Sequence, residues 1–197
     1  LRIVPERGGL ITEWRSNGRD ILYFDLERFN QKDKSVRGGI PVLFPICGDL
    51  PNDTLQVEKA NYLIRQHGFA RDSTWQIKPI NDPNSFVLCL QDNRASRSMY
   101  PYLFIVEIEV RLEKNTLNFS IIVQNRSQEK MPFSFGLHPY FNVMDLQKVR
   151  IEGLPSISTN HLNMMEGETE RLLEQIPEGV DFICSPSKPV TLVDLAA

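Results

Sequence analysis

The chain has 197 residues, of which 41% are hydrophobic and 24% are charged, a composition typical of one large globular domain with a core of its own. The formal net charge is −3 and no block of lysine or arginine stands out, which argues against a nucleic-acid partner. No apolar run approaches the roughly 20 residues that a membrane helix needs, and the start carries no secretory signal pattern, so no membrane partner is expected.

Cysteine usage points to a reducing compartment. The three cysteines are Cys47, Cys89 and Cys184. Their odd number and wide spacing fit neither a disulfide framework nor a metal-ligand pair. We therefore predict a cytoplasmic location, where disulfides are rare.

The first part of the chain is typical of β-structure. Leu1–Pro5 and Leu10–Arg15 have strand-like patterns, and Asn17-Gly18 is a strong signal for a tight hairpin. Ile21–Phe24 is expected as the returning strand. The polar stretch Glu27–Val36 is expected to be a surface loop.

Arg37–Gly48 is an apolar segment interrupted by glycine and proline. Pro41 and Pro45 argue against a helix or a central strand, so we expect irregular backbone across the end of a sheet. Gly38-Gly39 allows the backbone to approach a ligand closely. From this segment alone, Arg37 fits either a polar site or an exposed position beside a tight turn.

The rest of the sequence continues the β-pattern. Further strands are expected at Ser73–Ile77, Ser85–Leu90, Leu103–Leu112, Leu117–Val123 and Val149–Ile151. Gln91–Ser98 is read as a polar loop, and Asn160–Gln175 as the single place for a short helix. Strands spaced every 8–12 residues or so, with turn signals between them, predict an all-β sandwich or barrel.

Two histidines occur in similar apolar settings that contain glycine or proline. His67 lies in Gln66–Asp72, and His138 lies in Phe133–Phe141. We predict that the intervening strands bring both imidazoles to one pocket. A zinc site that also used His161 is disfavoured, since the three histidines lack any short ligand spacing.

Several motifs in series resemble the aldose 1-epimerase family, and most closely its glucose-6-phosphate 1-epimerase (hexose-6-phosphate mutarotase) branch. They are Arg37–Pro45, Leu50–Asp53, Gln66–Trp75 and Leu137–Phe141. The resemblance implies an all-β galactose mutarotase-like β-supersandwich, with residues 1–197 forming a single domain. Compared with the family pattern, we expect this domain to lack its first strands and its C-terminal strands.

The resemblance also implies a chemistry. Mutarotation interconverts α and β anomers through the open-chain aldehyde, which a general acid and a general base achieve without any metal or organic cofactor. By the resemblance, His138 is the general acid and His67 is the second catalytic histidine, hydrogen bonded near the ring oxygen. Arg37 and Arg71 are substrate-binding residues for sugar hydroxyls or a phosphate.

Aromatic residues near these positions have two interpretations. Phe69, Tyr140 and Phe141 would form an apolar wall against a sugar face, or else pack in the core. The partner is a small-molecule sugar or sugar phosphate.

The general base is not assigned. In this family it is a glutamate late in the sequence, and we expect it to lie beyond residue 197, since Glu166 and Glu168 match no base motif. Two function classes therefore stay open: an aldose or hexose-6-phosphate 1-epimerase, and a non-catalytic carbohydrate-binding module of the same fold without the base.

Overall fold

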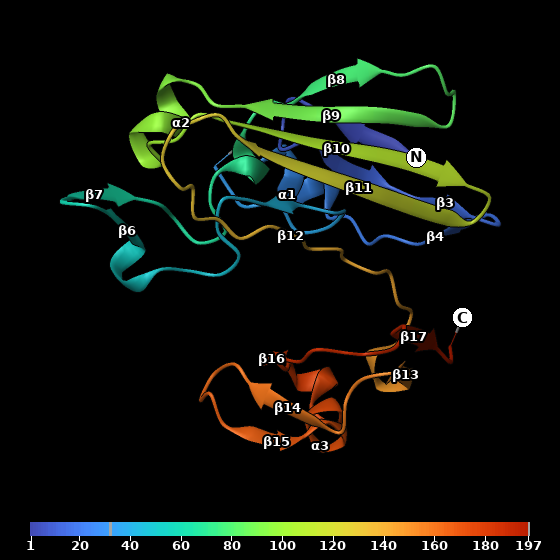
Figure 1. Ribbon diagram of the computed structural model, residues 1–197. Coiled ribbons are helices and arrows are strands. Elements are labelled where there is room, and N and C mark those ends of the chain that lie inside the picture. The colour runs from blue at the N-terminus through green and yellow to red at the C-terminus, as the bar shows by residue number, and fades with distance from the viewer. Residues whose placement is uncertain (32, 197) are drawn as a thin grey trace. The chain divides into compact units, whose positions relative to one another are not determined.

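The computed structural model (Figure 1) describes residues 1–31 and 33–196 of the chain. Contacts divide it into two units, Leu1–Phe141 and Asn142–Ala197, and each unit is described by itself. Within the described residues, no helix is both long and apolar enough to span a membrane.

Unit 1 is built mainly from antiparallel strands. They are β1 (Arg2–Val4), β2 (Leu10–Glu13), β3 (Arg15–Ser16), β4 (Arg19–Asp20), β5 (Val42–Leu43), β6 (Thr54–Val57), β7 (Ala60–Leu63), β8 (Gln76–Pro79), β9 (Ser85–Gln91), β10 (Phe104–Glu113), β11 (Thr116–Asn125) and β12 (Gly136–Leu137). Two short helices, α1 (Leu26–Asn30) and α2 (Arg94–Met99), and two 3-10 turns, Pro51–Asp53 and Ala70–Asp72, complete the unit.

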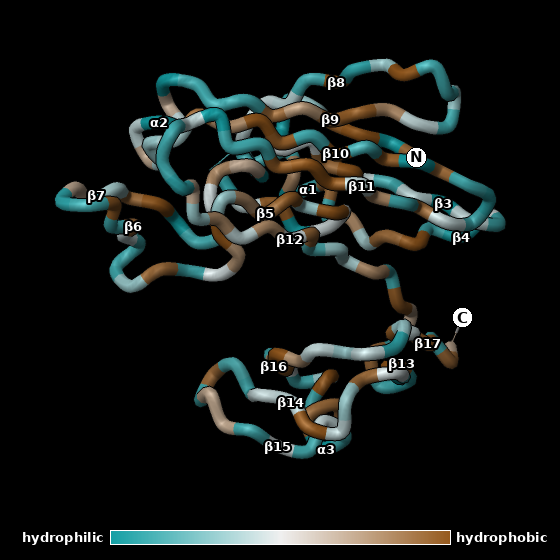
Figure 2. The backbone as a smooth tube through the Cα atoms, in the orientation of Figure 1, coloured by the Kyte–Doolittle hydropathy of each residue, from teal (hydrophilic) through white to brown (hydrophobic). Residues whose placement is uncertain are grey.

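The largest sheet has the strand order β11-β10-β9-β8. In β10 the side chains of Phe104, Val106, Ile108 and Val110 are buried, and the residues between them are partly exposed. This alternation is expected of a strand with one face on a core, because successive side chains point to opposite faces. Figure 2 shows the corresponding hydrophobic colouring along β9 and β10.

The other side of the core comes from segments that are irregular or short. Ile11, Ile40, Phe44 and Trp75 are buried in the same cluster as the β10 side chains. The Phe44 ring packs on Phe104 with centroids 5.1 Å apart. The predicted irregular apolar segment therefore packs against the main sheet, and only Val42–Leu43 within it is a strand.

Several sequence predictions hold. The Asn17-Gly18 turn joins β3 to β4, with both residues at positive φ as a tight hairpin requires. The strands expected around β9, β10, β11 and β13 (Val149–Glu152) are present within a few residues of the expected bounds. The all-β fold class is confirmed.

Other predictions were wrong. Ile21–Phe24 is not a continuous strand, because only isolated bridges form at Leu22 and Phe24. Glu27–Val36 is not all loop, since the Asp25 carboxylate accepts a hydrogen bond from the Arg28 amide and caps α1.

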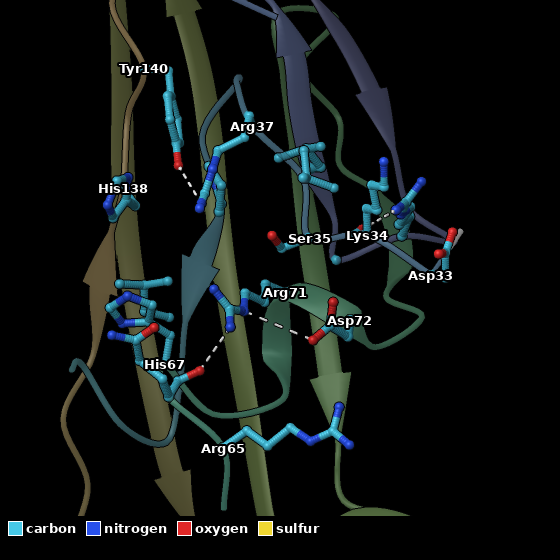
Figure 3. Close-up of a pocket in the computed structure, with 17 residues that line it drawn as sticks. Asp33, Lys34, Ser35, Arg37, Arg65, His67, Arg71, Asp72, His138 and Tyr140 are labelled. Carbon is cyan, nitrogen blue, oxygen red and sulfur yellow. Dashed lines mark hydrogen bonds and ion pairs between the residues drawn. The ribbon is translucent and has the colours of Figure 1, made fainter. Parts of the chain in front are cut away.

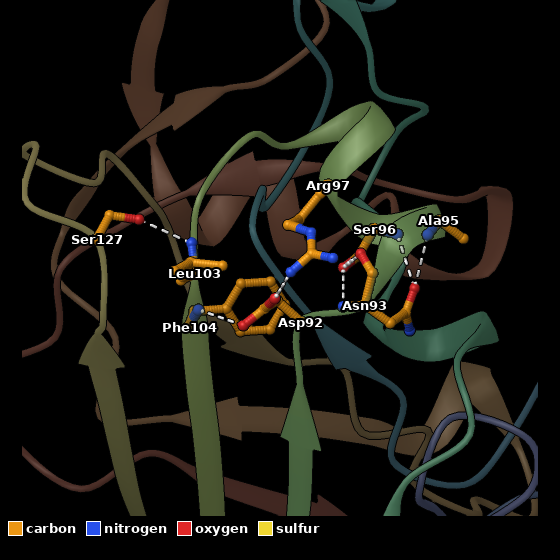
Figure 4. Close-up of polar contacts among 8 residues, drawn as sticks. All are labelled: Asp92, Asn93, Ala95, Ser96, Arg97, Leu103, Phe104 and Ser127. Carbon is orange, nitrogen blue, oxygen red and sulfur yellow. Dashed lines mark hydrogen bonds and ion pairs between the residues drawn. The ribbon is translucent and has the colours of Figure 1, made fainter.

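The stretch Gln91–Ser98 also contains a helix, α2 (Figure 4). Asn93 and Ser96 form a capping box at its start, and the Asp92 carboxylate bonds both Arg97 and the Phe104 amide. Asp92 therefore fixes α2 to the beginning of β10, and the helix expected within Asn160–Gln175 is not the single helix of the described chain.

Unit 2 contains small antiparallel sheets. Its strands are β13, β14 (Ile157–Asn160), β15 (Glu166–Glu168), β16 (Phe182–Ile183) and β17 (Thr191–Asp194), with α3 (Thr169–Leu173) and 3-10 turns at Leu146–Lys148 and Ile176–Glu178. β13 pairs with β17, and β14 lies between β15 and β16. His161 lies beyond β14 and pairs with Asp181 at 3.0 Å.

Candidate active site

The irregular segment around β5 connects the two histidine-bearing segments. β5 pairs with β12, and directly after β12 the His138 amide donates to the Pro41 carbonyl at 3.0 Å. Gly68 forms an isolated bridge with Phe44, whose carbonyl accepts the Phe69 amide at 3.1 Å. The two histidines, distant in sequence, are thus attached to the same short stretch of backbone.

Glycine is required at position 68. Its φ is +69°, and a Cβ atom there would lie 2.2 Å from the Phe44 carbonyl oxygen. Such a distance is far inside any permitted contact, so the loop that carries His67 can approach this backbone only because Gly68 has no side chain.

The histidines line a pocket of about 580 Å³ in unit 1 (Figure 3). Of the predicted site residues, the pocket is lined by His67, His138, Arg37, Arg71 and Tyr140. A volume of this size is within the usual range for small-ligand sites. The geometric prediction that both imidazoles face one pocket is therefore met.

His67 is held in one orientation by its neighbours. The Gly48 amide donates to His67 Nδ1 at 3.0 Å, and the His67 amide donates back to the Gly48 carbonyl at 2.7 Å. Because a backbone amide can only donate, Nδ1 is an acceptor, and the neutral ring carries its proton on Nε2.

The surroundings of His67 also favour the neutral ring. Burial lowers the pKa of His67 below its usual value, and the positive field of Arg71 and the neighbouring His138 lower it further, whereas Asp49 acts in the opposite direction. His67 is therefore suited to donate a hydrogen bond from Nε2 to a ligand oxygen near neutral pH.

His138 is placed differently. Its ring lies 5.0 Å from the Tyr140 ring and 6.0 Å from the His67 ring, measured between centroids. Among the described residues, no hydrogen bond to the His138 ring is found. Both of its nitrogens are therefore available for a ligand or for proton transfer.

The two predicted arginines are held at the pocket by different contacts. Arg71 donates to the Gln66 carbonyl at 2.8 Å and lies 3.8 Å from the Asp72 carboxylate. Arg37 makes a long contact of 3.5 Å with the Tyr140 hydroxyl. Both guanidinium groups keep further N–H donors for an anion.

Two of the predicted aromatic residues, Phe69 and Phe141, are placed elsewhere. Phe69 does not line this pocket: it is 8% exposed and packs with Phe44 and Phe104 in the core. Phe141 is 47% exposed and is also absent from the lining. For Phe69, the burial and the ring contacts agree with the core-packing alternative.

Several charged lining residues were not predicted from the sequence. They are Arg7, Lys34, Arg65, Asp33 and Asp72. Counting only the described residues, five Lys or Arg side chains and two carboxylates line the pocket, so its charge is positive even with both imidazoles neutral. Such a site favours an anionic ligand.

The protein is a mainly antiparallel β-fold with a pocket that holds two histidines, and comparison with known sequences gives its family. The sequence model described as aldose 1-epimerase matches residues 3–181. The chain belongs to the aldose 1-epimerase family.

Individual relatives agree with this assignment. A protein of Cenchrus ciliaris named "Putative glucose-6-phosphate 1-epimerase" is 30% identical over 95% of this chain and 58% of its own length. The chain thus spans a little over half of that relative.

Solved structures show the same fold. The crystal structure of the Slr1438 protein from Synechocystis sp. PCC 6803 matches with a TM-score of 0.89 and 33% identity, covering 98% of this chain and 68% of that one. A galactose mutarotase related enzyme from Lactobacillus acidophilus matches with a TM-score of 0.66 and 21% identity, over 91% of this chain and 56% of its own.

Proposed function

We propose that this protein interconverts the α and β anomers of a hexose 6-phosphate by acid/base ring opening. The observation that carries the proposal is the pair of imidazoles, 6.0 Å apart between centroids, in a pocket that also holds Arg37 and Arg71. The family assignment and the name of the Cenchrus ciliaris relative support it.

The proposed reaction needs two proton transfers. His138 donates a proton to the ring oxygen while a base removes the proton of the anomeric hydroxyl, so the bond between C1 and the ring oxygen breaks and an aldehyde forms. Rotation about the C1–C2 bond and reclosure give the other anomer. His67 donates a hydrogen bond from Nε2 to a sugar oxygen and orients the ring.

Charge favours a phosphorylated sugar over a neutral one. Arg37 and Arg71 present free N–H donors, and guanidinium groups bind phosphate oxygens in pairs. In a hexose 6-phosphate the ring oxygen lies between C1 and C5, the carbon that bears C6. An acid at the ring oxygen and cations beyond C6 would therefore contact neighbouring parts of one substrate.

A second candidate function rests on the carboxylates. Within the described lining these are Asp33 and Asp72, both exposed, and neither has a recorded hydrogen bond to an imidazole. No carboxylate of the described lining is therefore assigned as the general base. A module that binds a sugar phosphate without converting it is the second candidate function.

Anomer exchange measured by NMR with glucose and with glucose 6-phosphate tests both candidates. We expect exchange above the buffer rate for the phosphorylated sugar, lost in His138→Asn. Binding of glucose 6-phosphate without faster exchange would favour the binding module. Absence of binding, or equal binding of glucose, would overturn the phosphate assignment.

The contribution of Arg71 provides a separate check. Arg71→Ala removes charge-assisted hydrogen bonds to phosphate and should weaken glucose 6-phosphate binding about tenfold or more, with little effect on glucose. Unchanged affinity for the phosphorylated sugar would show that Arg71 is structural.

A further inference from the structure

Arg7 lies in the turn after β1 and lines the pocket, and its side chain is partly buried. Its guanidinium donates to three main-chain carbonyls on another part of the chain: those of Phe29, Gln31, the latter at 3.4 Å, and Lys34 at 3.0 Å. The same group lies 4.6 Å from the centroid of the Phe29 ring. One arginine therefore binds the end of α1 and the backbone of a pocket lysine together.

The residue after Arg7 is fixed against the segment that carries Arg71. Gly8 has φ +80°, and its amide donates to the Ser73 carbonyl at 2.8 Å. A Cβ atom on Gly8 would lie 2.2 Å from the Arg71 carbonyl oxygen. The turn that carries Arg7 is therefore in direct backbone contact with the segment that carries Arg71.

Arg7 therefore links two cation-bearing segments of the pocket, because its side chain contacts the backbone of Lys34 and the turn that carries it contacts the backbone of Arg71. Lys34, Arg37 and Arg71 all line this pocket (Figure 3). The segment that carries Lys34 has a further contact, since Arg28 donates to the Ser35 carbonyl at 2.8 Å, but Arg28 does not line the pocket. Arg7, in contrast, both lines the pocket and contacts the Lys34 backbone directly.

We propose that Arg7 is a positioning residue that sets the preference for a phosphorylated sugar, by holding the Lys34 segment at a fixed separation from Arg71. This inference rests on the proposed function and adds a residue to it. Several cations bind one phosphate well only if their positions are fixed beforehand, because ordering flexible side chains during binding costs affinity.

Lysine at position 7 separates positioning from charge. A guanidinium presents five N–H donors in a rigid fork, whereas an ammonium group is a compact point charge that cannot reach three separated carbonyls. Arg7→Lys keeps the positive charge and loses the hydrogen bonds to the three carbonyls. Arg7→Gln loses both.

Arg65→Gln is the matched control. Arg65 lines the same pocket, and among the described residues its side chain forms no ion pair or hydrogen bond, so this change removes one positive charge without removing a backbone contact. The measurement is calorimetric binding of glucose 6-phosphate, inorganic phosphate and glucose to the whole chain and to the three variants.

We expect Arg7→Lys and Arg7→Gln each to weaken glucose 6-phosphate binding about tenfold or more, and Arg65→Gln by about fivefold at most. Glucose binding should change little. Hydrogen exchange at the Lys34 amide, which donates to the Gln31 carbonyl at 3.1 Å, should accelerate in both Arg7 variants and not in Arg65→Gln.

The outcomes separate this inference from the proposed function. If the wild-type chain does not prefer the phosphorylated sugar, the proposed function fails and this inference fails with it. If the wild type shows the preference and Arg7→Lys retains it, Arg7 acts through charge alone and the positioning role is wrong. Should Arg7→Gln fail to fold, the comparison of Arg7→Lys with Arg65→Gln still decides.

Discussion

The ring centroids of His67 and His138 lie 6.0 Å apart, with an angle of 66° between the rings. The two imidazoles differ in the hydrogen bonds that their ring nitrogens already make. The Nδ1 atom of His67 is occupied by the Gly48 amide, and no bond to the His138 ring is found in the described part of the chain. This asymmetry suits His67 to hydrogen-bond donation and His138 to proton transfer.

Substitution of the two histidines should therefore have unequal effects. His138→Asn removes the proposed general acid, so we expect anomer exchange to fall by about 100-fold or more, with sugar phosphate binding nearly unchanged. His67→Gln retains an N–H donor and should cost about tenfold. Exchange measured by NMR under saturating substrate checks both. Equal losses in the two variants would contradict the assignment of roles.

The titration of His67 offers a test that does not depend on activity. Its pKa is lowered by burial and by Arg71, so the midpoint of the His67 titration, followed by the NMR shifts of its ring protons, should lie below the ordinary histidine value of 6.5. Inorganic phosphate bound beside Arg71 should raise the midpoint, because the anion stabilises the imidazolium. A midpoint above 6.5 without phosphate would contradict the structure.

The same shift has a consequence for stability. Between the lowered pKa of folded His67 and about 6.5, the unfolded chain binds a proton that the folded chain does not. The free energy of unfolding should therefore decrease as pH falls through this window. His67→Gln should flatten this part of the stability profile, and chemical denaturation at several pH values measures it.

Much of the fold follows from local sequence patterns. The Asn17-Gly18 turn and the alternating run of β10 require particular backbone conformations wherever they occur. The missed helix α2 also had a local signal, since Asn93 and Ser96 have the spacing of a capping box. The prediction of a loop rested on the polar composition of that stretch and did not use the cap.

The candidate site was only partly predictable, for a physical reason. His67, His138, Arg37 and Arg71 occur in distinctive motifs, but Arg7 does not. The role proposed for Arg7 depends on three carbonyls that tertiary structure brings to it from α1 and the residues that follow. Neither composition nor spacing encodes such long-range contacts, and the inward direction of Phe69 depends on them as well.

Glycine at position 68 should be intolerant of a side chain. Gly68→Ala places a Cβ atom 2.2 Å from the Phe44 carbonyl at positive φ, so we expect a loss of at least about 2 kcal/mol in unfolding free energy. Gly18→Ala is the matched control, since Gly18 also has positive φ but nothing within 4 Å of its Cβ position. It should cost about 1 kcal/mol. Similar values for both, measured by urea unfolding, would mean that the close approach to Phe44 is not maintained in solution.

The carboxylate of Asp92 offers a test of the scaffold alone (Figure 4). Its side chain is 6% exposed, and its oxygens accept from Arg97 at 2.9 Å and from the Phe104 amide at 3.0 Å. Asp92→Ala leaves the Phe104 amide and part of Arg97 without these partners, and we expect a loss of about 2–3 kcal/mol.

Two further variants separate the parts of this contact. Asp92→Asn keeps an acceptor for the Phe104 amide and loses the charge, so it should cost about 1 kcal/mol. Arg97→Ala should cost about the same or less, because the Arg97 side chain is 47% exposed and its ion pair is screened by water. Thermal unfolding gives the order, and the His67 titration should stay the same in all three variants, since none of these residues lines the pocket. If Asp92→Asn were as damaging as Asp92→Ala, the charge on Asp92, and not its hydrogen bond to β10, would hold α2 in place.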